Sequence, residues 1–129
     1  MGSQHPSTAC QRIFYIDDDA ELASLFKRML ERIGYRITTQ CLPLAALESL
    51  SRDPSQFDLV VTDYRMPALN GIEVARAIHD HHPGLRCAVV SGDVSPHMRE
   101  SAAAAGVGLV FQKPFTPREC EDLILRCVA

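Results

Sequence analysis

Short apolar runs alternate along the chain with longer segments in which apolar residues recur every three or four positions. Short runs rich in β-branched residues are typical of strands buried on both faces of a sheet. The longer pattern is typical of amphipathic helices that pack one face on a core. The expected strands are residues 12–16, 35–40, 58–62, 86–91 and 108–112. The expected helices are residues 22–33, 43–50, 70–82, 95–106 and 120–128.

Five strands that alternate with five helices predict an α/β domain with a parallel sheet and helices on both of its faces. Right-handed crossovers and the common doubly wound arrangement give the strand order 2-1-3-4-5, which is a flavodoxin-like (βα)5 fold. Ligands of such folds bind beyond the carboxyl ends of the strands where the order reverses. We therefore expect functional side chains after the first and third strands.

The chain has 129 residues, a length that fits one domain with a real core. Residues 1–10 are polar and have no periodicity, so we expect a flexible tail or an expression remnant there. The folded domain is expected at residues 11–129. A formal net charge of −3 offers no basic surface for a nucleic acid.

Two further features of the composition bear on location. No apolar run approaches the roughly 18 residues of a membrane span, so we expect no membrane contact in this chain. The five cysteines are an odd number with no CxxC pair, which indicates reduced thiols that serve as small apolar side chains. Both features predict a cytoplasmic protein.

Ionisable and hydroxyl side chains follow four of the expected strands. They are Asp17 and Asp18 after the first, Asp63 after the third, Ser91 after the fourth and Lys113 after the fifth. Neighbouring strands lie about 4.8 Å apart, so these carboxylates are expected to share one pocket. Three crowded carboxylates need a compensating charge, and Mg²⁺ prefers such oxygen ligands while keeping positions open for a phosphate oxygen. With Mg²⁺ and Lys113, the formal charge of the pocket is about zero, which suits an incoming phosphoryl group.

The segments YIDDDAEL, DLVVTDYRMPALNGIEVARAI, CAVVSGD and FQKPF occur in this order. Together they resemble the receiver domain of two-component response regulators, over roughly residues 11–129. The resemblance implies that Asp63 accepts a phosphoryl group from a phosphohistidine donor. It also implies that Asp17, Asp18, Asp63 and the main-chain carbonyl of Arg65 bind Mg²⁺.

The resemblance further implies that the Ser91 hydroxyl and the Lys113 amine contact the phosphoryl oxygens and are drawn inward by them. On this basis the chain is a phosphorelay module that switches conformation, with self-catalysed phosphotransfer and autodephosphorylation but no other enzyme activity. Its partner would be a sensor histidine kinase or a histidine phosphotransfer protein, and the chain would be a monomer or a weak dimer. Its motifs are also similar to those of receivers at the C-terminus of hybrid sensor kinases, so a stand-alone protein and a fragment both remain open.

Two other functions are weaker alternatives. A phosphohydrolase of the haloacid dehalogenase type needs its nucleophile in a DxDx(T/V) motif after the first strand. Asp17 and Asp19 are followed by Glu21, so this motif is absent. A receiver-like domain kept only for protein binding would not need the acidic pair, Asp63 and Lys113.

Several polar residues near the motifs have structural explanations. Asp19 is expected to cap the helix that follows it, and Asn70 and Gly71 are expected to form a turn and a cap. Three histidines near positions 79–82 end a helix, where a positive charge suits the helix dipole. No cysteine accompanies them at the spacing of a zinc site, so we expect no zinc there.

The resemblance leads to three finer expectations. The Lys113–Pro114 peptide bond should be cis, as it is in the family. Arg65 and Asp93 should overhang the pocket mouth, at positions that in the family tune the loss of the phosphoryl group to water, and their opposite charges could pair across the entrance. Val110 occupies a position that is commonly aromatic in the family, and strand alternation directs Phe111 to the opposite face of the sheet.

Overall fold

A computed structural model describes residues 12–113 and 116–128 of the chain. Its strands are β1 (Arg12–Ile16), β2 (Arg36–Gln40), β3 (Leu59–Asp63), β4 (Arg86–Ser91) and β5 (Val110–Gln112). Its α-helices are α1 (Ala20–Glu31), α2 (Pro43–Arg52), α3 (Gly71–His81), α4 (Pro96–Ala104) and α5 (Pro117–Val128), with a short 3-10 helix, η2 (Pro54–Gln56).

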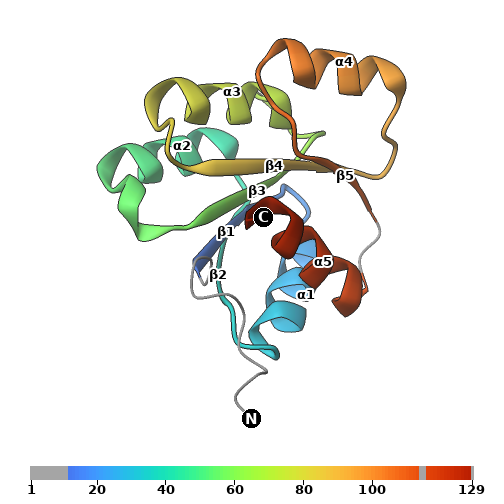
Figure 1. Cartoon of the computed structure of the whole chain (residues 1–129). Helices are drawn as coiled ribbons and strands as arrows, with labels where there is room; N and C mark the ends of the chain where they lie inside the picture. Colours follow the sequence, from blue (N-terminus) through green and yellow to red (C-terminus); the bar gives the residue numbers. More distant parts are fainter. Residues whose placement is uncertain (1–11, 114–115, 129) are drawn as a thin grey trace.

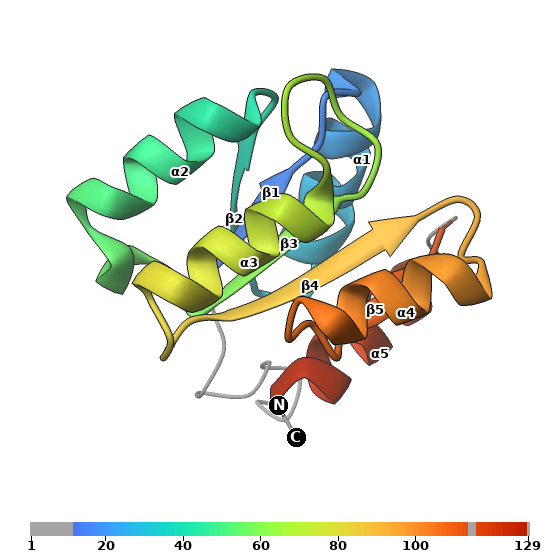
Figure 2. The same ribbon diagram turned by 90° about the horizontal axis from the view of Figure 1, so that it is seen from above.

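The strands form one parallel sheet in the order β2-β1-β3-β4-β5, which confirms the predicted topology. Figure 1 shows α2, α3 and α4 on one face of the sheet and α1 and α5 on the other. Figure 2 shows the loops after β1 and β3 at the same edge of the sheet. That edge collects the carboxyl ends of the strands, where the sequence predicted functional side chains.

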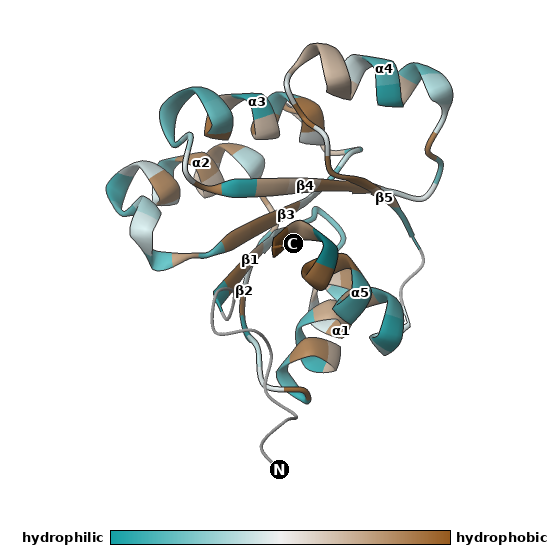
Figure 3. Cartoon of the chain, viewed as in Figure 1, coloured by the Kyte–Doolittle hydropathy of each residue, from teal (hydrophilic) through white to brown (hydrophobic). Residues whose placement is uncertain are grey.

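The two central strands are buried on both faces. Every residue of β3 is buried, as is every residue of β1 except Arg12. Figure 3 shows these strands as hydrophobic, while the outer sides of the helices are largely hydrophilic. Successive residues of β1 face opposite layers, so Tyr15 packs with α1 and α5, and Phe14 packs with α2 and α3. Continuous apolar runs in the sequence were therefore a correct indication of strands with two covered faces.

Capping side chains determine where two of the helices begin. The Asp19 carboxylate accepts hydrogen bonds from the main-chain N–H groups of Glu21 and Leu22, at 3.1 Å each. Asn70 forms a capping box with Glu73 at the start of α3. These contacts satisfy N–H groups that have no partner within the helix, and they confirm both predicted caps.

The fifth strand separates two layers as the alternation predicted. Val110 packs against the cluster of Met98 and Ala102 under α4. Phe111 packs on the opposite face with the α1 and α5 cluster, and the Arg126 guanidinium lies 5.2 Å from the centre of its ring. Phe111 therefore cannot take the place of an aromatic residue at position 110.

Three remaining expectations concern the periphery of the fold. The tail at residues 1–10 and the Lys113–Pro114 bond lie outside the described residues. No helix in the described part of the chain is both long and apolar enough to cross a bilayer. Among the described residues, Cys120 and Cys127 are buried and Cys41 and Cys87 are partly buried, as expected of small apolar side chains, and none of the four forms a disulfide.

Candidate functional site

The carboxyl ends of the parallel strands bring the predicted polar residues to one edge of the sheet. Ile16 of β1 lies opposite Thr62 of β3, so the next residues, Asp17 and Asp63, lie beside each other. The main-chain N–H of Lys113 donates to the carbonyl of Ser91 at 2.8 Å, which fixes the residue directly after β5.

A lysine joins the two buried carboxylates. Nζ of Lys113 lies 2.9 Å from Oδ2 of Asp17 and 2.9 Å from Oδ1 of Asp63. The Lys113 side chain is only 14% exposed, and those of Asp17 and Asp63 are 1% and 11% exposed. A buried charge is tolerated when it is paired and hydrogen-bonded, so these three groups depend on one another.

A third carboxylate completes an acidic cluster. Asp17, Asp18 and Asp63 each offer an oxygen, and these three oxygens lie within 4.8 Å of one another. Asp18 is exposed, so the cluster opens to solvent on one side. Asp18 also lines a shallow hollow together with Arg65 of the β3–α3 loop. Hard oxygen ligands beside open space fit Mg²⁺, which keeps several waters in its coordination shell.

Burial and mutual hydrogen bonds shift the pKa values of Asp63 and Lys113. Burial raises the pKa of the Asp63 carboxyl; the hydrogen bond from Lys113 acts in the opposite direction, and the charge of Asp17 raises the pKa further. Burial alone would lower the pKa of the Lys113 ammonium. The hydrogen bonds to Asp63 and Asp17 outweigh burial, so the pKa of Lys113 is raised and the amine stays charged.

Ser91 lies at the end of β4, and its hydroxyl is hydrogen-bonded to the main chain of the loop that follows. The hydroxyl donates to the Asp93 carbonyl at 3.2 Å and accepts from the Asp93 N–H at 3.3 Å. Arg65 and Asp93 are both exposed, and the described residues contain no ion pair between them. The pairing that opposite charges could make across the entrance is therefore not formed in this structure.

Two residues that contact the site were not predicted from the sequence. The Tyr15 hydroxyl donates to Oδ2 of Asp17 at 2.7 Å. A Cβ placed on Gly71 would lie 2.3 Å from the main-chain oxygen of Asp63, so this position cannot carry a side chain without displacing the backbone. A signal for Tyr15 was present, since it lies two residues before Asp17 and thus on the same face of the strand.

The histidines near the end of α3 lie outside the acidic cluster. Within the described ranges, the three aspartates are the single group of at least three metal-ligating side chains close enough to hold one ion. The rings of His81 and His82 lie 6.4 Å apart and are tilted. The absence of zinc from this region stays a prediction.

Comparisons with known proteins identify relatives of the chain. The family model described as the response regulator receiver domain matches residues 13–125. The response regulator receiver protein CpdR of Brucella abortus is 30% identical over 109 residues, which cover 84% of this chain and 89% of that protein. The putative two-component response regulator ARR13 of Arabidopsis thaliana is 30% identical over 110 residues, 83% of this chain. The chain spans only 19% of the length of that plant protein.

Solved structures agree with this relationship. A CheY-like response regulator receiver domain protein from Methanospirillum hungatei has a TM-score of 0.81 and 26% identity, covering 91% of this chain and 92% of that one. A response regulator receiver domain protein from Clostridium thermocellum has a TM-score of 0.83 and 24% identity, covering 92% and 94%. The match over residues 13–125 is decisive: the chain belongs to the family of response regulator receiver domains.

Proposed function

We propose that this chain is a phosphoacceptor module of a two-component phosphorelay, with Asp63 as the residue that is phosphorylated. The observation that carries the proposal is the Lys113 amine, which lies 2.9 Å from carboxylate oxygens of both Asp17 and Asp63. An amine so placed can neutralise charge on a group attached to Asp63. The transfer of a phosphoryl group requires mainly positioning and charge neutralisation, which this arrangement supplies.

The Asp63 carboxylate is the proposed nucleophile. One of its oxygens attacks the phosphorus of a phosphohistidine, and the phosphorus–nitrogen bond breaks. The electron pair of that bond returns to the imidazole nitrogen, which takes up a proton. Burial raises the pKa of Asp63, and a more basic carboxylate is a better nucleophile once it is ionised.

The residues proposed to hold Mg²⁺ are Asp17, Asp18, Asp63 and the main-chain carbonyl of Arg65. When bound, the ion would offset the negative charge of the carboxylates and of the phosphoryl oxygens. The clustering of the three carboxylate oxygens within 4.8 Å supports this assignment for the aspartates.

Ser91 and Lys113 are the proposed switch. A phosphoryl group adds about two negative charges and three strong hydrogen-bond acceptors. The Ser91 hydroxyl, now held by Asp93, and the Lys113 amine, now held by two carboxylates, would each turn toward those acceptors. Two loops would then move together, which is a change that a partner can recognise.

The proposed partner is a sensor histidine kinase or a histidine phosphotransfer protein. Residues 11–129 form the receiver in this proposal, either as a stand-alone protein or as part of a larger one, and the location is cytoplasmic. Self-catalysed phosphotransfer and slow loss of the group to water are the only reactions proposed.

A phosphohydrolase of the haloacid dehalogenase type is disfavoured by the use of Asp19. Its carboxylate accepts two main-chain N–H groups as the cap of α1, which gives it a structural role at this position. Incubation with a generic phosphate ester separates the two functions. A receiver gives at most one labelled residue per chain, whereas a hydrolase gives sustained turnover.

Binding of beryllofluoride, which mimics a phosphoryl group, tests the proposal. The CheY protein of a CheX–CheY complex from Borrelia burgdorferi, with a TM-score of 0.84 and 16% identity, was solved with BeF3 and Mg²⁺. In an NMR titration, we expect beryllofluoride to shift the amide signals of Ser91 and Lys113 when Mg²⁺ is present and not when it is absent. The Asp63→Asn variant should show no shift. Equal shifts in that variant would overturn the assignment.

A further inference from the structure

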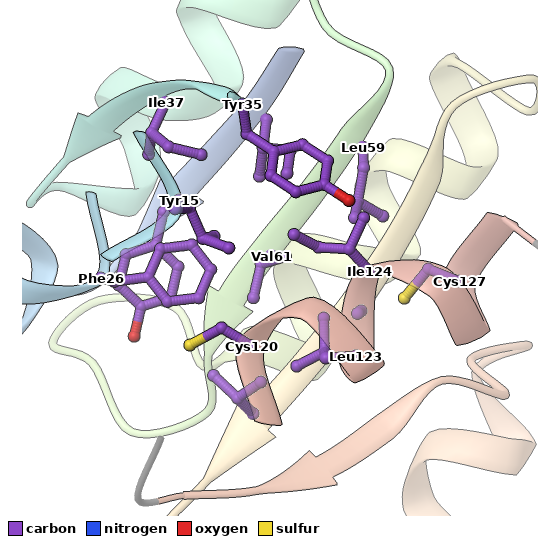
Figure 4. Packing of buried hydrophobic residues seen from close by; sticks show 14 of the residues in the cluster. Tyr15, Phe26, Tyr35, Ile37, Leu59, Val61, Cys120, Leu123, Ile124 and Cys127 are labelled. Atoms are coloured by element: carbon purple, nitrogen blue, oxygen red, sulfur yellow. The ribbon is translucent and has the colours of Figure 1, made fainter. Parts of the chain in front are cut away.

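A buried tyrosine contacts the acidic site from the core of the protein. Tyr15 in β1 has no exposed surface, and its ring stacks on Phe26 of α1 with the ring centres 4.1 Å apart. Figure 4 shows both rings in the cluster between the sheet and the helices α1 and α5. The packing fixes the ring, and the hydroxyl at its end donates to Oδ2 of Asp17 at 2.7 Å.

The Asp17 carboxylate accepts hydrogen bonds from three donors and is almost completely buried. Its Oδ1 accepts the main-chain N–H of Asp19 at 2.9 Å. Its Oδ2 accepts the Tyr15 hydroxyl at 2.7 Å and Nζ of Lys113 at 2.9 Å. Asp17 itself is 0% exposed, so water does not replace a donor that is lost.

The three donors differ in their freedom to move. Asp19 donates from the main chain at the start of α1, and Tyr15 donates from a ring held by the core. Lys113 has a long flexible side chain and is shared with Asp63. When Lys113 turns away from Asp17, the Tyr15 hydroxyl is the one side-chain donor in the described residues that stays on Oδ2.

We propose that Tyr15 is a positioning residue for Asp17 and that its hydroxyl raises the affinity of the acidic site for Mg²⁺. The inference rests on the proposed function in one respect, that Mg²⁺ is the cation of this site. The hydroxyl keeps Oδ2 hydrogen-bonded on the side that faces the core and holds the plane of the carboxylate. Without it, Oδ2 would face the apolar core with Lys113 as its only remaining donor, and Lys113 would then compete more strongly with a cation for Asp17.

The Tyr15→Phe variant tests this inference because it removes one oxygen and keeps the ring. Loss of a hydrogen bond that orients a metal ligand typically weakens metal binding roughly 10-fold to 100-fold, so we expect the Kd for Mg²⁺ to rise about 10-fold. The Kd is measured by calorimetry or by an NMR titration with MgCl2 alone, without a phosphodonor.

Tyr35→Phe is the matched control. Tyr35 is 3% exposed and belongs to the same hydrophobic cluster, so the substitution deletes the same atom from the same core. Figure 4 shows the Tyr35 hydroxyl in a different part of that cluster from Tyr15. We expect this variant to keep its Kd for Mg²⁺ within about twofold of the wild type.

Urea unfolding without Mg²⁺ measures the stability of both variants, so that a loss of Mg²⁺ affinity through positioning can be told apart from a general loss of stability. A purely structural role predicts that both variants bind Mg²⁺ like the wild type, or that both are weakened equally. Either result would overturn the inference while leaving the phosphorylation of Asp63 intact. A wild type that binds no Mg²⁺ would overturn the proposed function as well.

A measurement on the wild type keeps the inference testable if Tyr15→Phe does not fold. The hydroxyl proton of Tyr15 is buried and hydrogen-bonded, so it should exchange slowly and give its own NMR signal. We expect this signal to persist at saturating MgCl2. Its disappearance on addition of Mg²⁺ would show that the hydrogen bond breaks, and the inference would fall.

Discussion

The surroundings of the Asp63 carboxylate disfavour its negative charge. The residue is 8% exposed and lies near a second buried carboxylate, Asp17. Burial raises its pKa, Lys113 opposes this, and the charge of Asp17 adds to the rise. A carboxylate kept in such a place, here the proposed nucleophile, is expected to cost stability, as functional groups often do.

Removal of this charge should stabilise the fold. We expect Asp63→Asn to raise the free energy of unfolding by about 1 kcal/mol at pH 7. Because the pKa of Asp63 is higher in the folded than in the unfolded state, the wild type gains stability as the pH falls through the folded-state pKa. The advantage of the variant should therefore shrink as the pH falls from 7 toward 4.

Urea unfolding across this pH range checks the prediction. Asp80→Asn serves as the control, because Asp80 is an exposed carboxylate on α3. Its unfolding free energy should stay within about 0.5 kcal/mol of the wild type at each pH. A less stable Asp63→Asn protein at pH 7, or an advantage that grows as the pH falls, would contradict the account.

Arg65 and Asp93 are exposed residues that follow Asp63 and Ser91 by two positions. The structure shows no ion pair between them, so their joint replacement by alanine should change the free energy of unfolding by less than about 0.5 kcal/mol. We expect the rate of aspartyl-phosphate hydrolysis to change by about threefold or more. A tenfold change in rate corresponds to about 1.4 kcal/mol of activation free energy, so a threefold change requires only part of that. If the phosphorylated wild type and the phosphorylated double variant have the same half-life, this role is refuted.

The sequence predicted the positions of the charged residues better than their hydrogen bonds. Asp17, Asp63 and Lys113 could be placed together because each lies at the carboxyl end of a strand of one parallel sheet. The contact of Tyr15 with Asp17 was missed, although the two residues share a face of the strand, because Tyr15 fits an apolar run and its ring alone explains its burial. Its hydroxyl has a role that only the position of Asp17 reveals.

The segment between β3 and α3 connects the proposed phosphoacceptor to the helix that follows. Gly71 begins α3, and its N–H donates to the carbonyl of Tyr64 at 2.8 Å. The close approach of Gly71 to the main chain of Asp63 means that the first residue of α3 and the last residue of β3 are in direct contact. The sequence predicted only a turn and a cap here, since close approach of two backbones leaves no pattern in the apolar residues.

Gly71→Ala should therefore disturb the site through the backbone. A Cβ at 2.3 Å from the main-chain oxygen of Asp63 forces the backbone to shift. We expect the free energy of unfolding to fall by about 1–3 kcal/mol. Phosphorylation by acetyl phosphate should also become slower, because Asp63 moves. Gly84→Ala is the control, since a Cβ there meets nothing within 4 Å. If both variants behave alike, the proposed contact has no influence on the site.

The boundaries of two elements differ from those that the apolar pattern predicted. The fifth strand was expected at residues 108–112 but begins at Val110, and Gly108 before it has no side chain to pack. The fourth helix was expected to reach residue 106 but ends at Ala104, because Gly106 has a φ of +82°. Glycine is favoured in this left-handed region, so it ends a helix rather than extending it.

At the scale of the whole molecule, we expect the proposed signal to leave the site through β4, β5 and α4. Val110 packs under α4 and is stiff at χ1, while Phe111 lies on the other face of the sheet. Rotation of an aromatic side chain at position 110 is thus not available as a switch. The topology was predictable from right-handed crossovers, but the extent of this rearrangement depends on packing that the strand order does not define.

We expect phosphorylation to cause small shifts near Ser91 and α4 and little dimerisation through α4, β5 and α5. Light scattering with beryllofluoride and Mg²⁺, compared with Mg²⁺ alone, measures the change in mass. The chain should stay monomeric or weakly dimeric in both solutions. Full conversion to a dimer at low micromolar protein would show that Val110 does not limit the switch.

The central claim is that Asp63 accepts a phosphoryl group in a reaction that requires Mg²⁺. Its most direct test is intact-mass spectrometry after incubation with acetyl phosphate, followed by mapping of the modified peptide. The account predicts one phosphoryl group per chain, on Asp63, in the wild type and in the Asp80→Asn control. It predicts none in Asp63→Asn, and none in the wild type when a chelator removes Mg²⁺. Labelling of Asp63→Asn to the level of the wild type, or labelling that is unaffected by the chelator, would contradict the account.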